Sequence, residues 1–104
     1  MYKCKIVKNM FIIDLNYIVP LEEVDMHMAT HAEHLQKYYD QGIFVAWGRK
    51  QPRTGGVILA LADSKEKVEK IIREDPFYKY KLAEFAITEF LPGKYRPELS
   101  ALLG

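Results

Sequence analysis

Residues 10–42 read MFIIDLNYIVPLEEVDMHMATHAEHLQKYYDQG, and the hydrophobic pattern changes its period once within this stretch. From Met10 the pattern alternates, which predicts a β-strand whose buried face carries Phe11, Ile13, Leu15 and Tyr17. Pro20 breaks the strand, and the apolar residues after it recur at helical spacing until Gly42 provides a helix stop. We therefore expect the domain to begin with a strand followed by a helix.

The helix expected between Leu21 and Gly42 has an apolar stripe on one side. Its members are Leu21, Val24, Met28, Ala32, Leu35 and Tyr39. Of the three histidines on this helix, only His31 falls inside the stripe, whereas His27 and His34 lie to its side. An ionisable ring at a desolvated position needs a hydrogen-bonding partner. His31 is therefore the histidine of interest, and the sequence leaves the roles of His27 and His34 open.

The rest of the chain predicts a hairpin, a second helix and a last strand. Residues 43–48 and 56–62 have the composition of strands, and the loop between them is rich in Pro and Gly. Asp63 or Ser64 caps the second helix, and Pro76 ends it near Asp75. Residues 84–90 form the last strand. This order predicts an α+β fold of the ferredoxin-like, split βαβ type, a four-stranded antiparallel sheet with two helices on one face.

Length and charge limit the classes of protein to consider. A chain of 104 residues is long enough for one domain, which we place at residues 10–95, with an N-terminal extension at 1–9 and a tail at 96–104. The sequence leaves open whether Met10 is the biological start. Because the net charge is only +1, we expect neither nucleic acid nor a membrane as partner. The single cysteine, Cys4, cannot form an internal disulfide, which predicts a cytoplasmic protein.

The face of the sheet that the helices leave open is also expected to be apolar. By alternation it would carry Ile12, Ile18, Phe44, Ala46, Ile58, Ala60, Ala86 and Phe90. An apolar face of this size is not left in water on a monomer. We therefore expect a homodimer in which two sheets pack face to face.

The second helix directs a carboxylate inward. Val68, Ile71 and Ile72 define its buried face, and Asp75 returns to that face seven residues after Val68. If the two helices lie side by side, Asp75 can hold one nitrogen of His31, so that the other nitrogen exchanges a proton with a substrate. The alternative is a satisfied core histidine beside an Asp-Pro helix stop.

Two other groups of polar residues are candidates for binding sites. His27 and His31 have the helical spacing of a metal pair, but no suitably placed third ligand accompanies them, so we expect no metal. Arg49, Lys50 and Arg53 cluster on the hairpin loop, where they could hold an anionic substrate group. The alternative is a solvated loop.

These residues together resemble the YciI-like (YCII-related) family. The matching features are His31 followed by Gly42, the strand end Ala46-Trp47-Gly48, the segment Arg49-Lys50-Gln51-Pro52-Arg53-Thr54-Gly55-Gly56, and Asp75-Pro76-Phe77. The resemblance implies a dimeric α+β barrel, related in fold to muconolactone isomerase, with a His31–Asp75 active site near the dimer interface. It also implies a site without metal or organic cofactor, since a related dehydrochlorinase uses such a dyad for elimination. Gly48, Arg49, Arg53 and Phe77 are expected to bind the substrate.

Two functions follow as hypotheses. The first is a cofactor-independent lyase or isomerase, in which His31 transfers a proton on a small anionic or phenolic substrate and Asp75 fixes the tautomer. The second is a non-catalytic dimer that binds a small molecule or has a regulatory role. A substrate-sized cavity beside the dyad favours the first, and a dyad sealed from solvent favours the second.

Overall fold

The computed structural model describes residues 9–103; the predictions for Cys4 and for nearly all of the N-terminal extension lie outside these residues. The strands are β1 (Asn9–Tyr17), β2 (Phe44–Arg49), β3 (Gly55–Ala62) and β4 (Ala83–Phe90). The helices are α1 (Leu21–Met26), α2 (Met28–Asp40), α3 (Lys65–Arg73), α4 (Pro76–Lys79) and α5 (Ser100–Leu103), with a 3₁₀ turn, η1, at Pro97–Leu99.

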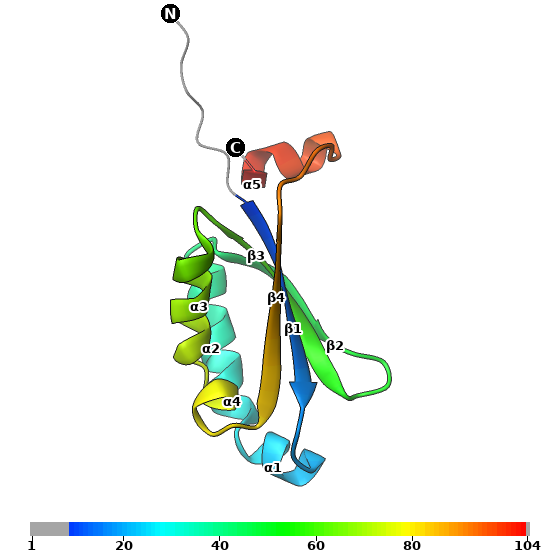
Figure 1. The fold of residues 1–104 in the computed structure, drawn as a ribbon, viewed down its shortest axis with the longest axis vertical. Coiled ribbons are helices and arrows are strands. Elements are labelled where there is room, and N and C mark those ends of the chain that lie inside the picture. Colours follow the sequence, from blue (N-terminus) through cyan, green and yellow to red (C-terminus); the bar gives the residue numbers. More distant parts are fainter. Residues whose placement is uncertain (1–8, 104) are drawn as a thin grey trace, which may run out of the picture.

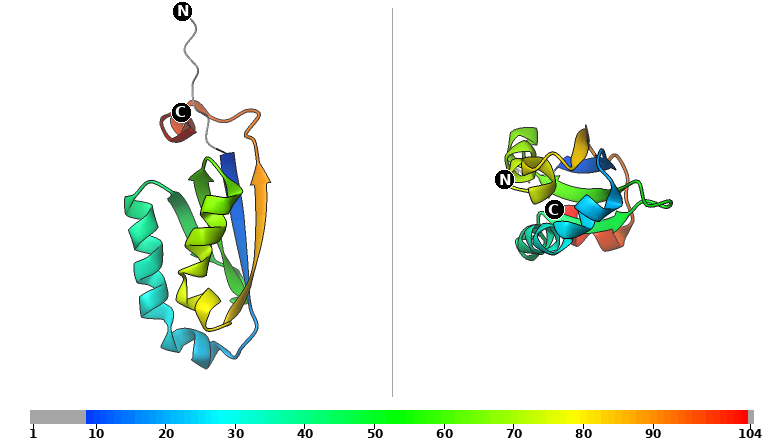
Figure 2. Two further views of the ribbon diagram at one scale, coloured as in Figure 1. Left: turned by 60° about the vertical axis from the view of Figure 1, so that its left-hand side comes forward. Right: turned by 90° about the horizontal axis from the view of Figure 1, so that it is seen from below.

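The four strands form one antiparallel sheet in the order β2-β3-β1-β4. Helices α2 and α3 lie side by side on one face of this sheet, and within residues 9–103 no helix lies across the opposite face (Figures 1 and 2). The predicted α+β, ferredoxin-like fold is confirmed. Within residues 9–103, no helix is long and apolar enough to cross a membrane.

Strand β1 organises the core as its alternation predicts. Phe11, Ile13 and Leu15 are at most 2% exposed and face the helices. Ile13 lies opposite Ile58 of β3 on one side and Ile87 of β4 on the other. Apolar side chains from three neighbouring strands therefore meet on the helix side of the sheet.

The prediction for the open face is wrong for Phe44, Ile58 and Ala60. These residues lie in the core and are at most 3% exposed. Residues 57–62 are all apolar, so the sequence pattern does not show which of them face the helices and which face the open side. In β2 the register shifts between Phe44 and Ala46, which places Phe44 on the core side and Ala46 on the open side.

The apolar residues of the open face come from all four strands, as the register shows. They are Met10, Ile12, Ala46, Val57, Leu59, Leu61, Ala86 and Phe90. Ile18, which was also expected there, follows the end of β1 and is 52% exposed. The open face is therefore still apolar, with a membership partly different from the predicted one.

The single helix predicted between Leu21 and Gly42 is divided at His27, which ends α1 and precedes α2. Tyr39, an expected member of the buried stripe, is 50% exposed. The buried positions of α2 are His31, His34, Leu35 and Tyr38. The prediction that His34 lies outside the buried stripe is therefore wrong.

The ends of the helices follow their capping residues. Gly42 adopts a positive φ of 78° just after α2, a conformation that favours glycine. Ser64, one of the two predicted caps, accepts a hydrogen bond from the Lys67 backbone N–H at the start of α3. At the other end of the chain, α5 lies beyond the end of the sheet where β1 begins (Figure 1).

Candidate active site

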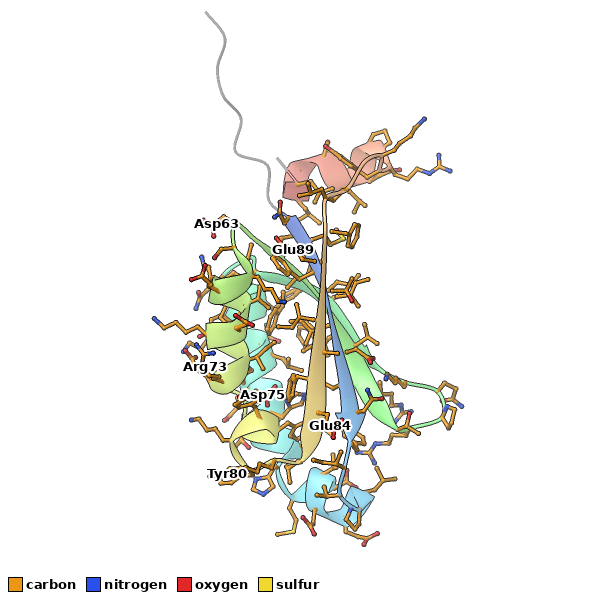
Figure 3. The ribbon with its side chains drawn as sticks, in the orientation of Figure 1. Asp63, Arg73, Asp75, Tyr80, Glu84 and Glu89 are labelled. Carbon is orange, nitrogen blue, oxygen red and sulfur yellow. The ribbon has the colours of Figure 1, made fainter. Side chains whose placement is uncertain are left out.

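Asp75 lies in the turn between α3 and α4, on the side that faces the sheet, whereas Arg73 points away from the core (Figure 3). The Asp75 side chain is only 1% exposed. Its Oδ1 accepts a hydrogen bond of 2.8 Å from the backbone N–H of Phe77, which makes Asp75 the N-cap of α4. The sequence Asp75-Pro76-Phe77 thus holds a buried carboxylate in a fixed position.

His31 of α2 meets this carboxylate across the helix layer. Its Nδ1 lies 2.8 Å from Asp75 Oδ1, so the contact predicted from periodicity is present. An ionised carboxylate only accepts hydrogen bonds, so this contact requires that Nδ1 carries the proton and leaves Nε2 as the basic nitrogen of a neutral ring. The ring also stacks on Phe77, with centroids 3.7 Å apart and planes at 3°. The contacts with Asp75 and Phe77 therefore fix both the position and the tautomer of the His31 ring.

A cavity of about 480 Å³ opens beside the His31 ring. Its wall includes five of the predicted site residues, namely His31, Gly48, Arg49, Arg53 and Phe77. Asp75 lies behind His31 and is not part of the wall. Most of the remaining wall is apolar, and Leu15, Leu35 and Trp47 contribute to it. The volume is that of a small-molecule site.

Gly55 keeps the end of this cavity compact. A Cβ atom at this position would lie 1.8 Å from the backbone oxygen of Leu15 on the neighbouring strand. Any side chain at Gly55 would therefore push β3 away from β1, at the point where both strands border the cavity.

The three cations of the hairpin differ in whether they are paired with a carboxylate. Arg53 forms an ion pair with Asp25 of α1, and hydrogen bonds from the guanidinium lower the pKa of the Asp25 carboxyl. Lys50 pairs with Asp14 at 2.6 Å and does not line the cavity. Arg49 lines the cavity and has no ion-pair partner among residues 9–103. Arg49 is therefore the available cation of the cavity wall.

The sequence did not predict the cluster around the second buried histidine. His34 packs edge-on against Tyr38 and Phe44, and desolvation lowers its pKa, with an opposing contribution from Asp75. The Tyr38 hydroxyl donates a hydrogen bond to Glu74. Burial, with Glu74 as the second cause, raises the pKa of Tyr38 to about 12. No local pattern joins residues that lie 36 positions apart.

The third histidine lies away from the cavity. His27, between α1 and α2, stacks on Tyr80 with ring centroids 4.7 Å apart, and neither ring lines the cavity. In the described part of the chain, no three His, Cys, Asp or Glu side chains gather in a way that could hold a metal ion.

Comparison with known proteins now gives the family. The model of the YCII-related domain matches residues 10–91, from the first residues of β1 to just beyond β4. The chain belongs to the YCII-related family. The match includes the His31–Asp75 pair and every predicted residue of the cavity wall.

The fold is similar to that of the 5-chloro-2-hydroxyhydroquinone dehydrochlorinase from Burkholderia phenoliruptrix AC1100, solved in complex with 2,5-dihydroxybenzoquinone. The TM-score is 0.68 at 19% sequence identity, covering 81% of this chain and 95% of the dehydrochlorinase. None of the curated proteins matches this chain. At this level of sequence identity, the similarity supports a shared fold alone.

Proposed function

We propose that this YCII-related protein is a cofactor-independent lyase or isomerase that moves a proton on a small anionic or phenolic substrate. The observation that carries the proposal is the His31 ring, which is hydrogen-bonded to buried Asp75 at one nitrogen and borders a cavity of about 480 Å³. A histidine that served only packing would not need both a fixed tautomer and a substrate-sized space.

Each side chain has a role in this proposal. Nε2 of His31 accepts a proton from the substrate, and Asp75 stabilises the imidazolium that forms. In an isomerase the same nitrogen returns the proton to another substrate atom. In a lyase a leaving anion departs with the bonding electron pair, and the proton on His31 passes to solvent. Arg49 compensates the negative charge that develops on the substrate.

Phe77 and Gly48 have supporting roles. Stacking on Phe77 fixes the plane of the His31 ring, so that Nε2 keeps one direction relative to the substrate. Gly48 lines the cavity with backbone atoms alone. A ligand can therefore approach the backbone of β2 closely at this point.

Hydroxyquinols are the first compounds to test, because the similar fold belongs to a dehydrochlorinase of 5-chloro-2-hydroxyhydroquinone. We expect wild-type protein to release chloride from this compound, or to exchange ring hydrogens of related hydroxyquinols for deuterium in D₂O, faster than buffer does. His31→Asn should remove the acceleration. Equal rates for wild type and His31→Asn would reject the catalytic role and favour the small-molecule-binding alternative.

We also propose that the protein is a homodimer joined through the open face of the sheet. The support is the set of apolar residues that all four strands present there, with no helix across them. Analytical ultracentrifugation should find twice the chain mass at micromolar concentration, and Leu59→Asp should shift the protein towards the monomer. A wild-type monomer under these conditions would contradict the proposal.

A further inference from the structure

One cation of the cavity wall already holds a carboxylate of the protein itself. Arg53 lies in the loop between β2 and β3, and its guanidinium nitrogens contact both oxygens of Asp25 in α1. Such paired contacts direct two N–H groups at one carboxylate. Arg53 lines the cavity, whereas Asp25 does not. The Asp25 carboxylate therefore pairs with Arg53 without entering the space that a substrate would fill.

The charges around the cavity can be followed residue by residue. The wall carries two cations, Arg49 and Arg53, and its other titratable members are His31 and Tyr17. Two carboxylates stand just outside, Asp25 on Arg53 and Asp75 behind His31. With His31 neutral, the charges of these groups cancel. Arg49 is the wall cation with no ion-pair partner among residues 9–103, so a ligand with two negative charges would find an unpaired cation for only one of them.

We propose that Asp25 is a specificity-determining residue that restricts the cavity to ligands with a single negative charge, by occupying Arg53 and leaving Arg49 to bind the anion. This inference rests on the proposed function, because it takes the cavity beside His31 as the substrate site. Asp25 already compensates the charge of Arg53, so a second negative charge on the ligand would gain little attraction from Arg53. The Asp25 side chain is 55% exposed, so solvent screens the ion pair and the expected effect is moderate.

The test measures binding without turnover, using two quinones that differ in charge. At neutral pH 2-hydroxy-1,4-benzoquinone is singly ionised, and 2,5-dihydroxybenzoquinone is doubly ionised. Calorimetric titrations at low ionic strength would compare wild type, Asp25→Asn, Arg49→Gln and Glu22→Gln. Glu22 is the matched control, since it is an exposed carboxylate of the same helix, outside the cavity wall.

We expect Asp25→Asn to bind the doubly ionised quinone about three- to tenfold more tightly, with less than a twofold change for the singly ionised one. Glu22→Gln should change neither affinity by more than twofold, and Arg49→Gln should weaken both. Equal gains in Asp25→Asn and Glu22→Gln would overturn the proposal, since they would reflect only the general field of the protein. Loss of affinity for both quinones in Asp25→Asn, or no binding of either quinone by any form, would also overturn it.

The outcomes separate this inference from the catalytic proposal. Charge selectivity that depends on Asp25, together with no proton transfer by His31, would reject the catalytic role alone. Proton transfer that depends on His31, with no effect of Asp25 on charge selectivity, would reject the role of Asp25 alone.

Discussion

Two histidines one helical turn apart on α2 have different surroundings. His31 donates to a buried carboxylate and borders a cavity, whereas His34 is packed between aromatic rings. Both residues are at most 9% exposed, so burial does not distinguish them. The partner distinguishes them, because the Asp75 carboxylate can stabilise a charge on His31 while desolvation opposes a charge on His34. For these two buried histidines, the neighbouring groups indicate the chemistry of the ring better than its exposed fraction does.

The largest expected effect is on turnover. His31→Asn should lower kcat/KM by roughly 100-fold or more, since an amide cannot accept a proton near neutral pH. His34→Gln should keep kcat/KM within a few-fold of wild type, because His34 does not line the cavity. Steady-state kinetics on any compound that the wild type converts gives both values. Comparable losses in the two variants would remove the distinction between the two histidines.

A second prediction concerns the stability of the His31 region. His31→Ala should lower the free energy of unfolding by about 1 to 3 kcal/mol, since it leaves a cavity and deprives buried Asp75 of a donor. His31→Asn should be closer to wild type, because the amide nitrogen of Asn takes nearly the place of Nδ1. Urea unfolding at fixed protein concentration measures both. A His31→Asn variant as unstable as His31→Ala would show that the asparagine does not restore the hydrogen bond to Asp75.

The pH dependence of stability should come partly from His34. Its pKa in the folded protein lies below the ordinary value of 6.5 because burial disfavours the charged ring. Between these two pKa values the unfolded chain binds more protons than the native state, so stability falls as pH drops below about 6.5. The slope contributed by one such group cannot exceed about 1.4 kcal/mol per pH unit.

Urea unfolding at pH 7.5 and pH 5.5 tests this assignment. Wild type should lose more stability between the two conditions than His34→Gln does, because the variant lacks the titrating ring. An identical loss in wild type and His34→Gln would contradict the prediction.

The smallest effect is expected at Tyr38. Tyr38→Phe removes the hydroxyl that donates to Glu74, at a cost of about 0.5 to 1.5 kcal/mol in unfolding free energy. Turnover should stay unchanged, since Tyr38 is outside the cavity wall. Tyr39→Phe is the control, because Tyr39 is 50% exposed. Reduced turnover in Tyr38→Phe would connect the His34 cluster to the reaction.

The sequence predicted the parts of the fold in which alternation or capping is unambiguous. Strand β1 alternates cleanly, and Phe11, Ile13 and Leu15 are buried as expected. Strand β3 is apolar on both faces and β2 contains a register shift, so the open-face prediction failed for Phe44, Ile58 and Ala60.

The site was predictable where a polar residue interrupts an apolar face. His31 and Asp75 do so on their respective helices, and they meet. A stripe that continues from Leu21 through His27 leaves His34 at its side, whereas the structure divides the helix at His27 and buries His34. The Asp25–Arg53 pair joins two segments 28 residues apart, and nothing in the local sequence of either one indicates the other.

The double role of Asp75 has a consequence for how such a protein diverges. The oxygen that holds His31 also caps α4, so a substitution at Asp75 disturbs the dyad and the local fold together. The hairpin loop that carries Arg53 contributes its side chain to the cavity without belonging to the core. Mutations in this loop can therefore alter which ligands are accepted while the proton-transfer pair stays intact. New substrate preferences should accumulate in the loop, and the pair of His31 and Asp75 should be inherited unchanged.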